Sequence, residues 1–288
     1  MTGALRAAAG LVKPRLSAFA ALATLSAYAA AGGAFSPRAA PLLLGVFLLA
    51  CGASALNELQ ERGPDGRMTR TKERPIPAGR LSPKAAALAA AALLAAGGLC
   101  VLWAGGRAAF FLGLFAAAWY NGVYTPLKRT TPFAAVVGSL SGALPPAIGW
   151  TAAAQPLFDP RLSALCFFFC LWQIPHFWLL VPEHGGDSER AGLPALTGIL
   201  DLGSVTRLIC VWMSVAAASC LLLPLFGTVS SAAGSAGLAA AASWLTWKAA
   251  RLLCCDRSPL SYRAAFADTN AFALSVMALV ALDRCCAL

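Results

Sequence analysis

Long apolar segments alternate with short polar connections along nearly the whole chain. The segments fall at about 17–35, 39–56, 85–104, 108–125, 133–153, 162–181, 205–227, 231–250 and 264–282. Each is close to the roughly 20 residues that an α-helix needs to cross a bilayer. They are continuous runs rich in Ala and Leu, without the alternation of a membrane β-strand. The pattern predicts an all-α, polytopic membrane protein with about nine transmembrane helices.

The composition agrees with a membrane protein, and the distribution of cations indicates its orientation. The chain is 59% hydrophobic and 12% charged, with a mean hydropathy of +0.71. With nine spans and a cytoplasmic N-terminus, eighteen of the 22 Lys and Arg residues face the cytoplasm, as the positive-inside rule requires. We therefore expect a cytoplasmic N-terminus and an external C-terminus. The cations lie in separate short loops, which argues against a nucleic-acid partner despite the net charge of +10.

The polar stretch 57–84, NELQERGPDGRMTRTKERPIPAGRLSPK, interrupts the apolar pattern. Asn57, Glu61 and Asp65 recur in it at a spacing of four, which places three oxygen-bearing side chains along one side of a helix. Mg²⁺ prefers such ligands, as one or two carboxylates together with substrate phosphates. Gly63-Pro64 lies inside the motif and predicts a helix break at about residue 62, so that the last carboxylate reaches the site from a turn.

Cations that suit phosphate oxygens follow these carboxylates on the predicted cytoplasmic side. The candidates are Arg70, Lys72, Arg74, Lys128 and Arg129. Each is also explained as a topology determinant or, for the last two, as a snorkelling anchor. A second cytoplasmic loop, 182–204, begins with the acidic residues Glu183, Asp187 and Glu189. We expect the two loops to converge on one diphosphate through Mg²⁺, with Glu61, Asp65 and Asp187 around a single cavity.

Several longer motifs connect these residues to a known superfamily. They are LVKPRLS at 11–17, the NxxxExxxD run at 57–65, RMTRTKERPIPAGRLS at 67–82, YTPLKRTTP at 124–132, GALPPAIGW at 142–150, QIPHFW at 173–178 and DSERAGLP at 187–194. The resemblance that they carry runs over nearly the whole chain. In these motifs the chain resembles the intramembrane aromatic prenyltransferase (UbiA-type) superfamily. The combination of KPR, TRTxxRPxPxG, LKRxT, GAxPPxxGW and PHFW is most similar to its haem-modifying branch.

The resemblance implies a fold and a reaction. The expected fold is a single domain, 1–288, whose helices surround a central cavity open to the cytoplasmic side, with active-site loops at 57–84 and 182–204. The expected reaction is Mg²⁺-dependent transfer of a farnesyl group from farnesyl diphosphate to a vinyl group of haem B, giving haem O for a terminal oxidase. The resemblance also implies a bacterial-type inner (cytoplasmic) membrane, contact with membrane lipid, and haem-handling or oxidase-assembly proteins as partners.

The site residues that the resemblance implies match the superfamily pattern unevenly. The implied catalytic residues and Mg²⁺ ligands are Asn57, Glu61, Asp65 and Asp187, and the implied diphosphate contacts are the five cations named above. Glu61 stands where the superfamily usually has Asp. Gly186 stands where an acidic neighbour of Asp187 is usual, so Glu183 or Glu189 is expected to complete the second motif.

The acceptor is expected near the cytoplasmic end of the sixth span. The candidate residues are His176, Trp172, Trp178, Tyr124 and Asn121. A histidine at membrane depth is a functional candidate, and the expected role of His176 is to coordinate the haem iron, which accepts axial histidine, or to contact a haem propionate. The same residues are also explained as a packed histidine and an interfacial aromatic belt. Asp268, in the last span, is expected to pair with Asn270 or Arg263.

Two other functions remain open at this point. One is prenyl transfer to a quinone precursor or another aromatic acceptor. The other is a catalytically decayed relative that acts as a transporter or an assembly factor. The departures at Glu61, Gly63-Pro64 and Gly186 keep the second alternative in view, because a decayed metal site would show such changes.

Overall fold

Helices cover the apolar segments predicted from the sequence in the computed structural model, which describes residues 10–33, 36–254 and 258–285. The main helices are α2 (Pro14–Ala30), α3 (Ala39–Asp65), α4 (Pro83–Ala118), α7 (Leu140–Ala152), α8 (Pro160–Trp178), α10 (Leu202–Ser219), α12 (Ala232–Cys254) and α13 (Pro259–Cys285). The shorter elements are η1 (Trp119–Tyr124), α5 (Thr125–Leu127), α6 (Ala134–Gly138), α9 (Val181–Arg190), η2 (Leu196–Gly198) and α11 (Leu222–Leu225). No strand occurs in these ranges, and the predicted all-α class is confirmed. The end of the first predicted segment, 34–35, lies outside the described residues.

Local sequence signals explain where several helices begin. Ser82 caps α4 by accepting a hydrogen bond from the Ala85 amide, and proline follows it at the first helical position. Asp159 caps α8 in the same way, again before a proline. Asp201 caps α10 through the Ser204 amide. Such caps satisfy amides that have no partner inside the helix, and proline at the first position loses no hydrogen bond there.

The two predicted segments 85–104 and 108–125 form one long element with a break between them. Gly106 has φ 79° and ψ −174° inside α4, so the backbone leaves the helical region at this residue. Glycine adopts such a conformation without the steric cost that a side chain would bring. The break turns α4 into two helical arms, the second of which continues into η1 and α5.

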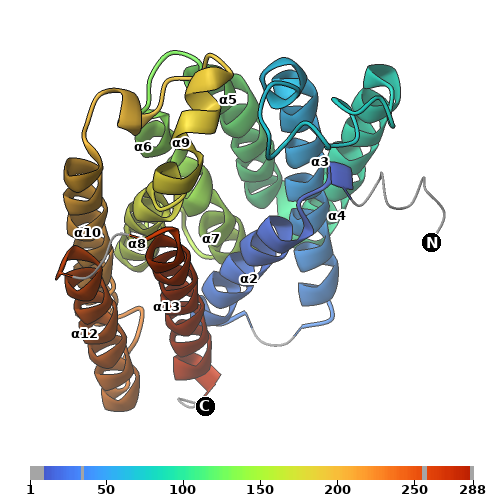
Figure 1. The fold of residues 1–288 in the computed structure, drawn as a ribbon. Coiled ribbons are helices and arrows are strands. Elements are labelled where there is room, and N and C mark those ends of the chain that lie inside the picture. Colours follow the sequence, from blue (N-terminus) through green and yellow to red (C-terminus); the bar gives the residue numbers. More distant parts are fainter. Residues whose placement is uncertain (1–9, 34–35, 255–257, 286–288) are drawn as a thin grey trace.

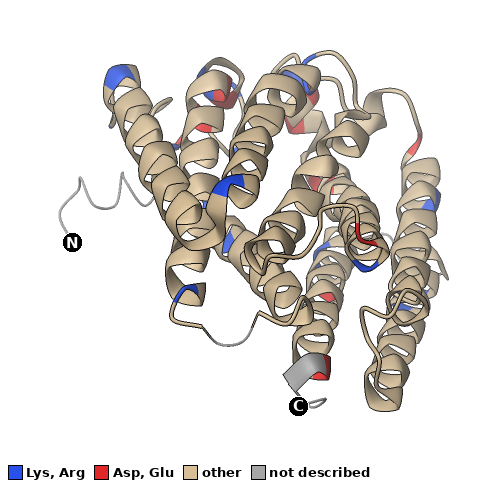
Figure 2. Cartoon of the chain, turned by 180° about the vertical axis from the view of Figure 1, so that it is seen from behind, with Lys and Arg blue, Asp and Glu red and all other residues tan. Residues whose placement is uncertain are grey.

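The helices pack around a closed circuit (Figure 1). Consecutive elements contact each other from α2 through α3, α4, α7, α8, α10 and α12 to α13, and α13 returns to contact α2. α2 also packs directly against α7, across the middle of the circuit. Acidic and basic residues lie beside one another at the end of the bundle that carries α5, α9 and the α3–α4 connection (Figure 2).

Several helices are long and apolar enough to cross a membrane. By length and hydropathy these are Ala39–Asp65, Pro83–Leu127, Leu202–Leu225 and Pro259–Asp283. α8 and α9, which are bent by 67° relative to each other, would form a fifth if they are one broken span. The protein is therefore a polytopic membrane protein. The number of nine crossings and the orientation of the termini stay predictions.

Close packing of α2 and α7 depends on Gly149. A Cβ atom at this position would lie 2.1 Å from the carbonyl oxygen of Thr24, which is main chain and cannot move aside cheaply. The Thr24 hydroxyl also donates to the carbonyl oxygen of Pro145, at 3.0 Å. Gly149 thus allows the two helices to approach closely, as small residues do at membrane helix interfaces.

Gly149→Ala is expected to destabilise the protein by about 1–3 kcal/mol, the usual cost of forcing an extra methyl group into packed structure. Thermal unfolding in detergent, followed by intrinsic fluorescence, measures the effect. Gly186→Ala is the matched control, because a Cβ atom there has nothing within 4 Å. That control is expected to be neutral or slightly stabilising, since alanine favours helix over glycine. Equal effects of the two variants would contradict the packing argument.

Candidate active site

A cavity of about 930 Å³ lies inside the bundle. Residues of α2, α3, the α3–α4 connection, η1, α7, α8, α9 and α13 line it. Its volume is near the upper end of the range for ligand pockets, roughly 300–1,000 Å³. Charged side chains from the α3 end of the bundle and aromatic side chains from α8 contribute to the same wall.

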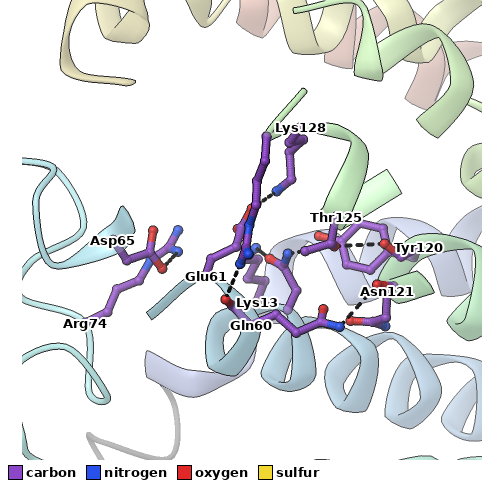
Figure 3. Close-up of polar contacts among 11 residues, drawn as sticks. Lys13, Gln60, Glu61, Asp65, Arg74, Tyr120, Asn121, Thr125 and Lys128 are labelled. Atoms are coloured by element: carbon purple, nitrogen blue, oxygen red, sulfur yellow. Dashed lines mark hydrogen bonds and ion pairs between the residues drawn. The ribbon is translucent and has the colours of Figure 1, made fainter. Parts of the chain in front are cut away.

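Two carboxylates of the first motif lie on the cavity wall, as the spacing predicts. Glu61 and Asp65 stand one turn apart at the end of α3, and both line the cavity. Glu61 forms an ion pair with Lys128, which follows α5. Asp65 is only 1% exposed and forms an ion pair with Arg74 at 2.6 Å. Figure 3 shows Lys128 and Arg74 approaching the two carboxylates from different elements.

The predicted helix break before Gly63-Pro64 is wrong. α3 continues to Asp65, with Pro64 inside it, and the Gly66 amide still bonds to the Arg62 carbonyl at 3.2 Å. Proline removes the amide that would have bonded to the carbonyl oxygen of Gln60. That oxygen instead accepts a hydrogen bond of 2.7 Å from the Arg129 guanidinium. The freed carbonyl is thus satisfied from outside the helix, and the second carboxylate stays in helical register with the first.

The cavity wall carries more positive than negative charge. Its cations are Lys13, Arg15, Arg70, Arg74 and Lys128, and its carboxylates are Glu61 and Asp65. Burial, and then the nearby Arg74, lower the pKa of Lys13, and the same two causes lower the pKa of Arg70. Cations held among like charges in a partly desolvated site favour an anion between them. This wall is suited to a multiply charged anion such as a diphosphate.

Asn57 lies behind this wall and does not line the cavity. It is fully buried. Its Oδ1 accepts a hydrogen bond from Lys13 Nζ at 3.0 Å, and its Nδ2 donates to Thr125 Oγ1 at 3.0 Å. Both ends of the amide are therefore used to connect α3 with α2 and α5. This contact holds the Lys13 ammonium on the cavity wall. Lys13 belongs to the KPR motif but is not among the site residues expected from the sequence.

Asp187 also lies away from the cavity wall. Its two oxygens accept hydrogen bonds from the backbone amides of Thr69 and Arg70, at 3.1 and 3.2 Å. Arg190 forms an ion pair with it at 3.2 Å. The amide of Thr69 is the main cause that lowers the pKa of Asp187 to about 2. Of the three carboxylates expected around one cavity, the structure brings Glu61 and Asp65 together on the wall and places Asp187 where it holds the α3–α4 connection against α9.

The other acidic residues of the second loop have partners of their own. Glu183 forms an ion pair with Arg263 of α13, and Glu189 accepts a hydrogen bond from Thr197 at 2.7 Å. Neither lines the cavity. Within the described ranges, no group of three His, Cys, Asp or Glu residues is arranged to hold a metal ion. Two carboxylates suit Mg²⁺ only if substrate oxygens and water supply the remaining ligands.

Asp187→Ala is expected to loosen residues 69–70 and to raise the KM for the diphosphate substrate expected from the sequence by about tenfold, because Arg70 loses its backbone anchor. A carboxyl whose folded-state pKa is depressed stabilises the fold above its unfolded pKa, near 3.8, and that contribution is lost as the pH falls through about 2. The effect of the substitution should therefore be the same at pH 5 and pH 8. Hydrogen–deuterium exchange of residues 69–70 and initial rates measure it.

The matched control for this prediction is Glu189→Ala. Glu189 lies on the same helix as Asp187, and its carboxylate accepts a hydrogen bond from the Thr197 side chain instead of from the amides of residues 69–70. We expect unchanged exchange at residues 69–70 in this variant. Unchanged exchange in Asp187→Ala as well would contradict the anchoring role.

The remaining candidate cations differ in position. Lys72 is exposed and Arg129 is turned to the Gln60 carbonyl, and neither lines the cavity. Arg70, Arg74 and Lys128 do. Of the five cations that the sequence proposed, the structure thus places three where a bound anion could reach them.

The acceptor candidates form an aromatic part of the wall. His176, Trp172, Trp178 and Tyr124 line the cavity, whereas Asn121 does not. The His176 ring lies 5.0 Å from Trp172, 4.8 Å from Phe266 and 5.5 Å from Phe177, measured between ring centroids. Asn121 is buried and bonds to the Ala117 carbonyl through its amide nitrogen. Lys128 Nζ stands 4.9 Å from the centroid of the Tyr124 ring, where the aromatic and charged parts of the wall meet.

Three further polar residues of the site were not among the site residues expected from the sequence. Glu58 is 1% exposed, and its Oε1 has no hydrogen-bond partner. Gln173 lines the cavity with an unpartnered Oε1. Asn270 lines it too and contacts His176. The available signal was their position, since polar side chains within or at the end of an apolar span are expected to face the bundle interior.

The expected partners of Asp268 are wrong. Asp268 forms an ion pair with Lys248 of α12 at 3.1 Å. Asn270 bonds to His176, and Arg263 bonds to Glu183. The Lys248 ammonium also lies over the rings of Trp244 and Trp247. This ion pair thus joins α12 to α13, a contact that the sequence did not predict.

A helical membrane bundle whose cavity joins a cationic end to an apolar, aromatic interior has the form of a binding site for an amphiphilic anion. Comparison with known proteins gives the particular class. The chain belongs to the UbiA prenyltransferase family, whose model matches residues 17–275. The resemblance seen in the motifs is confirmed, and the protein is a membrane prenyltransferase.

Similar curated proteins share one name. A protoheme IX farnesyltransferase of Geobacter sulfurreducens is 44% identical over 223 residues, which cover 76% of this chain and 81% of that protein. Another protein of this name, from Oleidesulfovibrio alaskensis, is 37% identical over 290 residues, which cover 97% of each chain. These relatives span most of the present chain.

Solved structures share the fold at low sequence identity. A digeranylgeranylglyceryl phosphate synthase aligns over 97% of this chain and 98% of its own, with a TM-score of 0.75 and 13% identity. The apo UbiA homolog of Aeropyrum pernix K1 covers 93% and 98%, with a TM-score of 0.74 and 17% identity. A UbiA homolog of Archaeoglobus fulgidus bound to GPP and Mg²⁺ covers 92% and 97%, with a TM-score of 0.62 and 15% identity.

Proposed function

We propose that this protein transfers a farnesyl group from farnesyl diphosphate to a vinyl group of haem B and so forms haem O. The observation that carries the proposal is a single cavity that joins the cations beside Glu61 and Asp65 to the aromatic wall around His176. The diphosphate, the apolar tail and a large flat acceptor each find a suitable part of this cavity. Relatives that are 37–44% identical to this chain bear the name of this activity.

The diphosphate binds at the cationic part of the wall. Arg70, Arg74 and Lys128 contact its oxygens, and Lys13 adds a fourth positive charge from α2. Mg²⁺, held by Glu61 and Asp65 together with diphosphate oxygens and water, would offset the charge that develops on the leaving group. A UbiA homolog of Archaeoglobus fulgidus binds GPP and Mg²⁺, which supports this assignment. Asn57 and Asp187 act through their neighbours, by placing Lys13 and Arg70.

The chemistry proceeds in an apolar interior. The bond between farnesyl C1 and the diphosphate oxygen breaks, and the electron pair leaves with the diphosphate. The π electrons of the vinyl group form the new carbon–carbon bond. The cation left beside the porphyrin is captured by water, which then loses a proton to the released diphosphate or to solvent. The aromatic faces of Trp172 and Tyr124 stabilise positive charge in the cavity, and exclusion of bulk water delays premature capture of the allylic cation.

The remaining aspects of the proposal follow from the setting. Bacterial relatives support a location in the inner membrane, with the N-terminus cytoplasmic by the charge distribution. Farnesyl diphosphate and haem B are the substrates, and haem-handling or oxidase-assembly proteins are the expected partners, since haem O serves a terminal oxidase. The membrane lipid supplies the surroundings of the farnesyl chain.

A product assay tests the proposal. Membranes that contain the full chain receive haem B, farnesyl diphosphate and Mg²⁺, and the extracted haems are analysed by mass spectrometry. The expected result is a hydroxyethylfarnesyl haem that disappears with EDTA and returns with Mg²⁺. Membranes with the folded protein that form no new haem would overturn the proposal. Farnesylation of a quinone precursor by the same membranes would then identify an aromatic acceptor of another class.

A further inference from the structure

We propose that Asn270 is a positioning residue that orients His176 so that its Nε2 atom binds the iron of the haem acceptor. The inference rests on the proposed function and adds to it the way in which the acceptor is held. It concerns two residues from helices far apart in sequence. His176 lies near the end of α8, and Asn270 lies in α13. Both line the cavity.

The contact between the two side chains defines which ring nitrogen is free. His176 Nδ1 lies 2.8 Å from Asn270 Oδ1. An amide oxygen only accepts hydrogen bonds, so Nδ1 carries the proton. A neutral imidazole has a single N–H group, and its other nitrogen, Nε2, then keeps a lone pair. Among the described residues, nothing donates a hydrogen bond to this Nε2, on a side chain that lines the cavity.

The surroundings hold the ring in this orientation. Trp172 and Phe266 lie at 35–40° to the imidazole plane, with centroids 5.0 and 4.8 Å away. Phe177 meets it edge-on at 5.5 Å. The imidazole cannot rotate freely between these rings without losing the Asn270 contact. The Asn270 contact and the three rings thus fix the imidazole, and Nε2 is the ring nitrogen left to a ligand in the cavity.

This arrangement has the features of a metal-binding histidine. Such histidines donate their second N–H to a fixed acceptor, which sets the tautomer and raises the basicity of the ligating nitrogen. Haem iron readily accepts one axial histidine. Binding the iron would fix the position of the porphyrin, and with it the distance from the vinyl carbon to farnesyl C1. Holding two reactants in such a geometry is a large source of rate acceleration.

Haem binding to the purified full-length protein in detergent tests the inference without requiring turnover. Haem B is added, the iron is reduced, and resonance Raman spectroscopy records the stretching band of the bond between ferrous iron and histidine. We expect the wild-type protein to show this band. His176→Gly should lose it and regain it with added imidazole. Asn270→Leu should shift it to lower frequency and weaken haem binding about 10- to 100-fold, whereas Asn270→Asp should shift it to higher frequency, because a carboxylate is a stronger acceptor.

The control variant is Thr269→Val. Thr269 is buried beside Asn270 on α13, and its hydroxyl donates to the Ala265 carbonyl of its own helix. We expect the Raman band of this variant to match that of the wild type. Such a result would show that the shifts in the Asn270 variants do not come from a general disturbance of α13. Thermal unfolding confirms that each variant is folded.

The outcomes separate this inference from the proposed function. Wild-type protein that forms haem O but shows no iron–histidine band would overturn the inference and leave the function standing. An unchanged band in His176→Gly, or in both Asn270 variants, would also overturn it. Wild-type protein that neither binds haem B nor forms a farnesylated haem would instead overturn the proposed function.

Discussion

Asp65→Asn is expected to lower kcat/KM for farnesyl transfer at least about a hundredfold, equivalent to about 2.7 kcal/mol of transition-state stabilisation. The substitution keeps the size of the side chain and removes its charge. Asp65 is 1% exposed, lies on the cavity wall and pairs with Arg74 at 2.6 Å. The neutral amide would weaken both the proposed Mg²⁺ site and the position of the arginine. Initial rates of haem O formation, with each substrate varied in turn, measure the loss.

The control for this prediction separates catalysis from folding. Asp201→Asn changes a carboxylate that caps α10 and does not line the cavity. It should change stability little, because asparagine caps a helix about as well as aspartate, and leave the rate within about twofold. Arg74 is 25% exposed, so solvent moderates the cost of leaving it without its partner. A folded Asp65→Asn protein with more than half of the wild-type rate would contradict the assignment.

Much of the fold follows from the sequence, because an apolar run of about 20 residues can satisfy its backbone hydrogen bonds in a bilayer only as a helix. The exception is instructive. Gly63-Pro64 predicts a helix end, yet α3 continues to Asp65. The missing proline amide is compensated by Arg129, which is 69 residues away from its partner Gln60. The helix-breaking tendency of proline describes the cost of its missing amide to the helix. It says nothing about a distant side chain that offsets this cost.

The same limit applies to the candidate site. The spacing of Glu61 and Asp65 correctly predicts that they share one side of α3, because helical period alone determines it. Asp187 resembles them as a residue type, but the backbone amides of Thr69 and Arg70 take up both of its oxygens. The contact of His176 with Asn270 joins two spans and leaves no periodic pattern in either. Pairings between helices depend on how the helices are rotated, which composition and spacing do not specify.

Lys128→Met is expected to raise the KM for farnesyl diphosphate about 10- to 100-fold, with a smaller change in haem binding. Lys128 lines the cavity, is 25% exposed, and carries its ammonium between Glu61 and the Tyr124 ring. Methionine keeps much of the apolar length and removes the charge. The wall would then lose one of its five cations, and Glu61 would lose its partner.

Arg129→Met is the matched control, one residue along the chain. Both residues are cations that follow α5, and by sequence alone both are diphosphate contacts or membrane anchors. Arg129 is exposed, does not line the cavity and donates to the Gln60 carbonyl. Its loss would leave a carbonyl that water can reach, so the expected cost falls on α3 stability and the KM should stay within about twofold. Equal KM values for the two variants would contradict the role of Lys128 on the cavity wall. They would mean that binding of the diphosphate depends only on positive charge near this surface. A raised KM confined to Lys128→Met would instead locate the diphosphate beside Glu61. The proposed Mg²⁺ must lie at the same place if the carboxylates and the cations bind one diphosphate.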